Sequence, residues 1–190
     1  PTPNGLVLHF KEIAKAVDMP IIIYNVPGRT GSNVSPATIV RIAREVPEVK
    51  AVKEASGSLN QMMEIINETA KNGTKELENF AVLSGDDALA LPLIALGGQG
   101  CISVVCNEAP KLFSKMIHLA LDGNIKEARK LHYAMLDLMN VNFIESNPIP
   151  VKHALASMGF IEESLRLPLT KLEEKNRVIV KKVLKELKLI

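Results

Sequence analysis

The sequence has few of the residues on which metal centres and disulfide frameworks depend. It contains only two cysteines, Cys101 and Cys106, and four histidines. The cysteines are close together, and no second Cys or His pair accompanies them, so the sequence favours neither a zinc site nor a disulfide scaffold. We therefore expect a reduced protein without a metal centre.

An excess of one charge and long apolar segments are also missing. The 23 Lys and Arg residues nearly balance the 21 Asp and Glu residues, and the formal net charge is +2. This balance argues against nucleic acid or a membrane surface as the partner. No apolar run approaches the roughly 20 residues that cross a bilayer, and residues 1–5 lack the apolar stretch of a signal peptide. We expect a cytoplasmic protein.

Apolar residues are present in sufficient number for a core, because 47% of the chain is hydrophobic, which excludes wholesale disorder. Short apolar segments alternate with segments of helical periodicity over residues 1–110. A helix between successive strands is typical of βαβ units, so we predict parallel strands. The expected strands span 21–26, 49–53, 80–83 and 101–105, and the expected helices span 6–17, 35–46, 59–71 and 88–96, the third ended by Asn72-Gly73.

The pattern changes after residue 110, where only helices are expected. We predict an α/β domain over 1–110 and a helical domain over 111–190. Four parallel strands would leave two unpaired edges, which natural folds generally cover. The chain is therefore either a small open sheet or part of a larger barrel, and the opening loop, entered without a preceding strand, favours the barrel. The carboxyl-terminal helices are expected at 110–121, 125–143, 149–158 and 172–189.

Lys53 is the residue most suggestive of chemistry. Strict alternation places Val49, Ala51 and Lys53 on one face of a strand, with Lys53 at its carboxyl end. Loss of hydration among small apolar neighbours disfavours an ammonium group, and the neutral amine is a nucleophile toward carbonyls. The alternative is a lysine that simply emerges into solvent where the strand ends.

Two further side chains are expected at the same edge. Tyr24 lies near the carboxyl end of the preceding strand, and parallel neighbours are only about 4.8 Å apart. Both side chains can then meet where α/β sheets and barrels place their chemistry. A phenol relays protons during carbinolamine formation, although a strand tyrosine is also an ordinary core residue. Arg29, in the expected loop between Gly28 and Gly31, suits a carboxylate; a solvated loop arginine is the alternative.

Other candidate motifs have structural interpretations. Residues 97–100, Gly-Gly-Gln-Gly, lack the Walker lysine and precede a strand, so we reject a phosphate cradle there. Residues 84–87, Ser-Gly-Asp-Asp, predict a turn and a helix start, in which Gly85 permits close backbone approach. The histidines fall on expected helices without the spacing of metal ligands.

Together these segments resemble the dihydrodipicolinate synthase family of the class I, Schiff-base aldolase superfamily. The resemblance runs from the first residues to the last and rests on five motifs in order. They are Tyr-Asn-Val-Pro-Gly-Arg-Thr-Gly at 24–31, Val-Lys-Glu-Ala-Ser-Gly at 52–57, Leu-Ser-Gly-Asp-Asp at 83–87, Gly-Gly-Gln-Gly-Cys-Ile-Ser-Val at 97–104 and Asn-Pro-Ile-Pro-Val-Lys at 147–152.

The resemblance implies the carboxyl-terminal half of a (β/α)8 TIM barrel, with four parallel strands and a helical carboxyl-terminal extension. It implies condensation of pyruvate with L-aspartate 4-semialdehyde to 4-hydroxy-tetrahydrodipicolinate, toward lysine and diaminopimelate. Lys53 would form the imine with pyruvate without a cofactor, Tyr24 would relay protons, and Arg29 would hold the aldehyde's carboxylate. Ile102 and Gly85 would line the pocket. Family members commonly form homotetramers.

Two alternatives remain beside this interpretation. Sibling aldolases, of the N-acetylneuraminate lyase or 2-keto-3-deoxy-gluconate aldolase type, share the tyrosine and lysine, but Arg29 favours a small aldehyde that carries a carboxylate. The chain lacks the first half of the family's barrel, so we expect it to be a fragment that is inactive alone. A non-catalytic half-barrel that acts by association is the second alternative.

Overall fold

The chain folds into two compact units. The computed structural model describes residues 1–71, 77 and 79–190, and its units are Pro1–Ile102 and Ser103–Ile190. The helix break expected at Asn72-Gly73 lies outside these residues, and the domain boundary expected after residue 110 stays a prediction. No helix in the described ranges has the length and apolarity of a membrane span.

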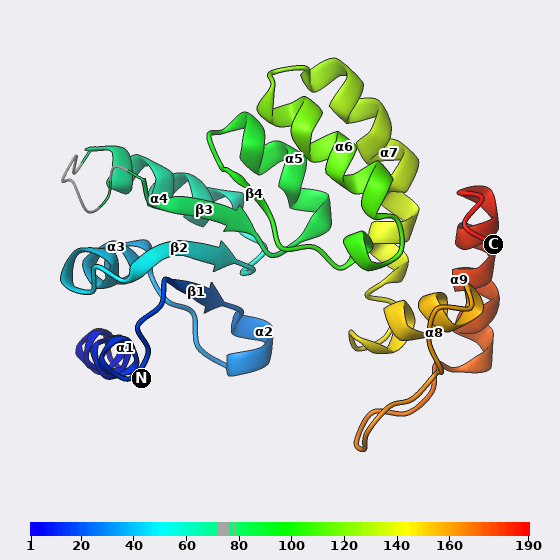
Figure 1. Ribbon diagram of the computed structural model, residues 1–190, viewed down its shortest axis with the longest axis horizontal. Helices are drawn as coiled ribbons and strands as arrows, with labels where there is room; N and C mark the ends of the chain where they lie inside the picture. Colours follow the sequence, from blue (N-terminus) through cyan, green and yellow to red (C-terminus); the bar gives the residue numbers. More distant parts are fainter. Residues whose placement is uncertain (72–76, 78) are drawn as a thin grey trace. The chain divides into compact units, whose positions relative to one another are not determined.

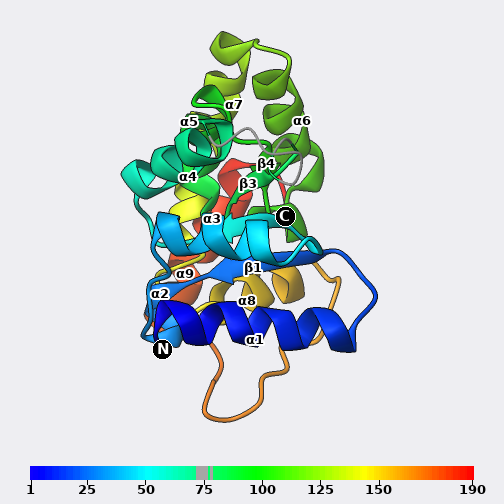
Figure 2. The same cartoon turned by 90° about the vertical axis from the view of Figure 1, so that its left-hand side faces the viewer.

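The first unit contains a sheet of four parallel strands in the order β1-β2-β3-β4 (Figure 1). This confirms the predicted βαβ arrangement. The strands are β1 (Ile21–Asn25), β2 (Val49–Glu54), β3 (Ala81–Ser84) and β4 (Gly100–Cys101), and the helices are α1 (Pro3–Ala16), α2 (Pro27–Thr30), α3 (Pro36–Glu45), α4 (Leu59–Lys71) and α5 (Asp87–Ala95). Contacts join α1 to α3, α3 to α4 and α4 to α5, and Figure 2 shows α1 and α3 beside β1.

Two helix starts form as the sequence indicates. The Ser35 hydroxyl accepts a hydrogen bond from the backbone N–H of Thr38 at 3.4 Å, and Pro36 occupies the first turn of α3. The Asp86 carboxylate accepts from the N–H of Ala88 at 2.8 Å. Each side chain satisfies a donor that the helix itself leaves unpaired.

The sheet has one face packed against helices and one face more open. Its packed face contributes to a single buried core, whereas Ile22 and Tyr24 on the other face of β1 are 48% and 50% exposed. The open face is the one that carries the expected chemistry. The core includes Ile23, Val49, Val52 and Val82 from the strands and Ile39, Ile42, Met62 and Ile65 from the helices.

A bulge in β2 interrupts the alternation of faces expected for this strand. Ile21 pairs with Val49, but Ile22 pairs with Ala51, so Lys50 is the extra residue. Because of it, Val49 packs in the helix-side core, and only Ala51 and Lys53 share the open face. The expectation that all three lie on one face was wrong for Val49, since an inserted residue changes the phase of a strand.

Two other expectations about β1 and β4 need correction. The segment after β1 was expected as a loop, but Pro27–Thr30 forms the one-turn helix α2, because Pro27 suits a first helical turn and Gly31 ends it at φ 68°. The strand expected at 101–105 is only Gly100–Cys101. Its one partner in the described sheet, β3, ends at Ser84, so the strand pairing stops near this residue. The Ser103 hydroxyl then accepts a hydrogen bond from the backbone N–H of Cys106 at 2.9 Å, and a 3-10 turn begins there.

The second unit is helical, as predicted for the carboxyl-terminal region. Contacts join α6 to α7, and α9 to both α7 and α8. Its elements are η1 (Val105–Asn107), α6 (Pro110–Leu121), α7 (Ile125–Val141), α8 (Ile149–Ser157) and α9 (Glu174–Glu186).

Candidate functional site

Lys53 and Tyr24 come together at the carboxyl ends of two neighbouring strands. They are direct partners in the β1–β2 register, and the Lys53 Nζ atom lies 4.0 Å from the centroid of the Tyr24 ring. A cation at this position is attracted by the ring's π electrons. The amine therefore contacts the face of the ring, and the tyrosine is half-exposed.

Gly85, which directly follows the neighbouring strand β3, lies against this lysine. A Cβ atom at position 85 would lie 3.2 Å from Lys53 Cε and 2.5 Å from Ala55 Cβ. The Gly85 N–H donates to the Glu54 carbonyl at 2.8 Å. The close approach expected at Gly85 is therefore present, and the neighbour that requires it is the strand end that carries Lys53.

Ile102 follows β4 at the same edge. Its N–H donates to the Ser84 carbonyl at 2.9 Å, which continues the β3–β4 pairing by one residue. The side chain is 41% exposed. Ile102 therefore places an exposed apolar side chain at this edge.

Arg29 lies in α2, directly after the strand that carries Tyr24. Its side chain is exposed, and its backbone N–H donates to the Val26 carbonyl at 2.9 Å. The Thr30 hydroxyl further links this turn to the Ser32 carbonyl at 3.0 Å. The arginine is therefore carried by a hydrogen-bonded turn and not by a loop that swings freely.

A buried polar cluster behind these residues was missed by the sequence reasoning. Glu54 is fully buried, and its carboxyl oxygens accept from the Asn25 side chain at 2.8 Å, the Gln61 side chain at 2.9 Å and the Ser56 N–H at 2.7 Å. Asn25 is 1% exposed and also donates to the side chain of Asn33 at 2.9 Å. The available signal was the alternation itself, which puts the residue after Lys53 on the helix side.

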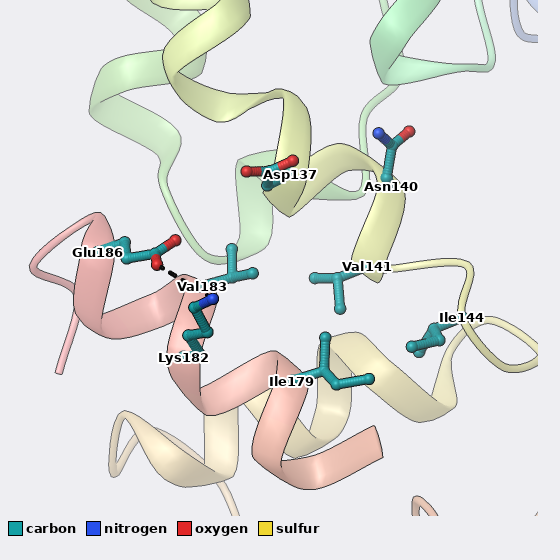
Figure 3. A pocket seen from close by; sticks show the side chains of 8 residues that line it. All are labelled: Asp137, Asn140, Val141, Ile144, Ile179, Lys182, Val183 and Glu186. Atoms are coloured by element: carbon teal, nitrogen blue, oxygen red, sulfur yellow. Dashed lines mark ion pairs between the residues drawn. The ribbon is translucent and has the colours of Figure 1, made fainter. Parts of the chain in front are cut away.

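One cavity lies in the second unit, and another lies beside Tyr24 itself. A cavity of about 440 Å³ between α7 and α9 belongs to the second unit (Figure 3), and an ion pair of 3.8 Å joins Lys182 and Glu186 at its wall. A cavity of about 320 Å³ beside β1 is lined partly by Phe10, Tyr24 and Thr30. Within the described ranges, no group of three or more His, Cys, Asp or Glu side chains could hold a metal ion.

Comparison with known proteins connects this geometry to one family. The model of the dihydrodipicolinate synthetase family matches residues 1–187. A 4-hydroxy-tetrahydrodipicolinate synthase from Chlorobium phaeobacteroides is 48% identical over 190 residues, which are 100% of this chain and 62% of the relative. The chain thus spans less than two thirds of the length of this relative.

Solved structures agree with this match. A dihydrodipicolinate synthase from Thermotoga maritima superposes with a TM-score of 0.95 at 42% identity, covering 100% of this chain and 63% of that one. A chloride-inhibited dihydrodipicolinate synthase from Acinetobacter baumannii, complexed with pyruvate, gives a TM-score of 0.92 at 44% identity, covering 100% of this chain and 62% of that one. The four strands are therefore part of a (β/α)8 barrel, and the chain belongs to the dihydrodipicolinate synthetase family.

Proposed function

We propose that this chain supplies the Schiff-base lysine of a pyruvate-dependent lyase that makes 4-hydroxy-tetrahydrodipicolinate from pyruvate and L-aspartate 4-semialdehyde. The observation that carries the proposal is the Lys53 amine, held 4.0 Å from the Tyr24 ring centroid at the carboxyl edge of a parallel sheet. The pyruvate complex of the related Acinetobacter baumannii enzyme supports pyruvate as the first substrate. The product would serve the synthesis of diaminopimelate and lysine.

The reaction begins with attack of the neutral Lys53 amine on the keto carbon of pyruvate. The carbinolamine that forms loses water to give an imine, and the Tyr24 hydroxyl carries protons to and from the departing oxygen. Protonation of the imine nitrogen makes the methyl group acidic, since that nitrogen accepts the electron pair as the proton leaves. The enamine carbon then attacks the aldehyde carbonyl and forms the new C–C bond, and the aldehyde oxygen takes up a proton to become the hydroxyl group of the product. The amino group of the substrate then attacks the imine carbon, which closes the ring and releases the Lys53 amine. The lysine is the electron sink, so we propose that no cofactor is needed.

Substrate choice is assigned to three other residues. Arg29 offers a planar cation that suits the carboxylate of the aldehyde substrate. Ile102 would contact pyruvate through its exposed side chain, and Gly85 would line the pocket where its backbone approaches Lys53 closely. A sugar-derived aldehyde, the substrate type of the sibling aldolases, offers hydroxyl groups where Arg29 would find a carboxylate.

Borohydride trapping tests the proposal on the full-length protein, by which we mean this chain joined to the amino-terminal barrel segment of the Chlorobium phaeobacteroides relative. We expect reduction in the presence of pyruvate to leave a stable adduct on Lys53, located by mass spectrometry of the peptides. Lys50→Arg is the matched control, because Lys50 lies in the same strand and is exposed; it should keep the adduct, whereas Lys53→Arg should abolish it. An unmodified Lys53 in the wild-type protein would refute the enzyme and favour a half-barrel that acts by association.

The identity of the aldehyde is tested by turnover. We expect the full-length protein to consume pyruvate with L-aspartate 4-semialdehyde faster than with sugar-derived aldehydes, and Arg29→Ala to raise KM for the semialdehyde more than KM for pyruvate. Preference for a sugar-derived aldehyde would instead indicate a sibling aldolase.

The state in which this half-site acts is a separate part of the proposal. The 190-residue chain is expected to be inactive alone and to gain activity when mixed with the amino-terminal segment of the Chlorobium phaeobacteroides relative that precedes the matched region. The active form is proposed to be a cytoplasmic homotetramer. Sedimentation of the active mixture measures the stoichiometry.

A further inference from the structure

The polar cluster centred on Glu54 is costly to bury. The Glu54 carboxyl group is fully buried, and Asn25 beside it is 1% exposed. No ion pair in the described part of the chain includes Glu54, and its recorded partners are two side-chain amides and one backbone N–H. A carboxyl group buried without a cation loses more hydration than neutral donors readily replace. An apolar pair would be the simpler choice for stability alone.

The cluster joins the two strand ends that carry the proposed catalytic pair. Asn25 follows Tyr24, and Glu54 follows Lys53 in the sequence; the two residues are direct partners in the β1–β2 register, as Tyr24 and Lys53 are. The hydrogen bond of 2.8 Å between Asn25 and Glu54 lies on the helix side of the sheet. It therefore joins the same two strand ends from the opposite face.

The cluster also holds the segments that flank the site. Gln61, in the first turn of α4, donates to Glu54 at 2.9 Å and to Asn33 at 3.1 Å. The Val34 N–H donates to the Asn25 side-chain oxygen at 3.0 Å. Asn33 and Val34 end the segment that begins with α2, so the turn that carries Arg29 is attached to the same cluster.

We propose that the Glu54–Asn25–Gln61 cluster is a positioning device that fixes the Lys53 amine over the Tyr24 ring through the strand ends. This inference rests on the proposed function. These three are positioning residues, because they lie on the helix side of the sheet and act through Lys53, Tyr24 and the segment after β1.

The side-chain chemistry of the cluster provides a sharp test. Glu54→Gln keeps the shape of the side chain but replaces one carboxyl oxygen by an NH₂ group. In the wild type both oxygens accept hydrogen bonds from N–H donors, so at least one of these bonds is lost in the variant. Asn25→Asp places a second carboxyl group against the first. In the double variant, the new amide at position 54 can donate to the new carboxylate at position 25 and still accept from the Ser56 N–H. The link between the two strands is then restored with its donor and acceptor exchanged, once the side-chain amides of Gln61 and Asn33 rotate by half a turn to face their new partners.

We expect kcat of the full-length protein to fall about 10- to 100-fold in each single variant, because small displacements of a reacting group cost rates of this order. The rate of borohydride-trapped adduct formation on Lys53 should fall in parallel, while KM for pyruvate changes less than kcat. The double variant should recover most of the lost rate. Recovery distinguishes positioning from a requirement for the charge at residue 54, which the double variant lacks.

A second buried Glu–Asn pair is the matched control. In the second unit, Asn142 donates to Glu108 at 2.6 Å, and the residues are 1% and 3% exposed. Glu108→Gln should lower the melting temperature as Glu54→Gln does, without the loss in the trapping rate at equal folded fraction. Gln61→Ala removes one donor at the rim of the cluster and provides a second test if Glu54→Gln fails to fold. We expect it to lower the trapping rate by about 3- to 10-fold.

Each result decides the inference. Wild-type trapping rates in folded Glu54→Gln or in Gln61→Ala overturn it, as does a folded double variant that recovers nothing. A wild-type protein that forms no adduct removes both this inference and the proposed function. A wild-type adduct with undiminished rates in the variants removes the positioning role and leaves the proposed function standing.

Discussion

Replacing Gly85 by alanine tests how tightly the site is packed around Lys53. The new Cβ would lie 2.5 Å from the Ala55 Cβ and 3.2 Å from Lys53 Cε. Carbon atoms in contact are normally about 3.5–4.0 Å apart, and the Ala55 methyl group cannot rotate away from the backbone. The strand ends must therefore separate by about 1 Å, a strain that typically costs roughly 1–3 kcal/mol.

Thermal unfolding and trapping measure the two effects of this substitution. For a protein of 150–250 residues, about 1 kcal/mol lowers Tm by roughly 2–4 °C, so we expect Gly85→Ala to lower Tm by about 2–12 °C. Adduct formation on Lys53 should slow by more than about tenfold, as expected for a displaced nucleophile.

Gly28→Ala is the matched control, because a Cβ at position 28 meets no atom within 4 Å. An unchanged Tm and an unchanged trapping rate in Gly85→Ala would refute the inferred packing. A loss of Tm with a normal trapping rate would show that Lys53 adapts, and would remove Gly85 from the site.

Three further predictions concern single side chains. Tyr24→Phe keeps the ring beneath the amine but removes the proposed proton carrier, so kcat should fall by about 10²–10⁴-fold. Burial lowers the pKa of His132 below the ordinary 6.5. Because the unfolded chain then binds protons more readily than the folded chain, stability should be lost as the pH falls below 6.5. His132→Leu should lack this effect. Glu163→Gln removes a carboxylate 3.1 Å from His153 and 3.4 Å from Arg177, and should cost about 1–3 kcal/mol in urea unfolding.

Each of these variants has a counterpart in the second unit at a more accessible position. Tyr133→Phe, His118→Leu and Glu162→Gln change the same side chains where none of them is buried, and none should show the effect. A rate loss in Tyr133→Phe as large as that in Tyr24→Phe would contradict the proton role. A pH dependence that survives in His132→Leu would assign it to another group.

The sequence was sufficient to predict the order of the four strands and of the longer helices, and the meeting of Lys53 with Tyr24. Both followed from periodicity and from the common edge of parallel strands. The exact faces did not follow, because the Lys50 bulge shifts Val49 to the helix side, and a bulge has no fixed signal in composition. The end of β4 depends on the length of its partner β3, which lies outside the segment itself.

The sequence pattern did not predict the helical turn that carries Arg29, nor the hydrogen bonds of the Glu54 cluster. The expected strand ends at residue 26 and a loop is expected after it, although proline at position 27 equally suits the first turn of a helix. The contacts of Glu54 with Asn25 and Gln61 join separate elements of the fold. Alternation could have placed Glu54 on the side opposite Lys53, but only the fold supplies its partners.

The bulge in β2 also determines where this strand can tolerate changes in length. Evolutionary insertions and deletions near Lys50 would be absorbed at the amino end of the strand, because the pairing from Ala51 to Glu54 is continuous. A deletion of Lys50 is thus expected to leave the amine opposite its aromatic partner. Loss of Val52, by contrast, would turn the Lys53 side chain toward the helices, so length variation among relatives should concentrate before Ala51.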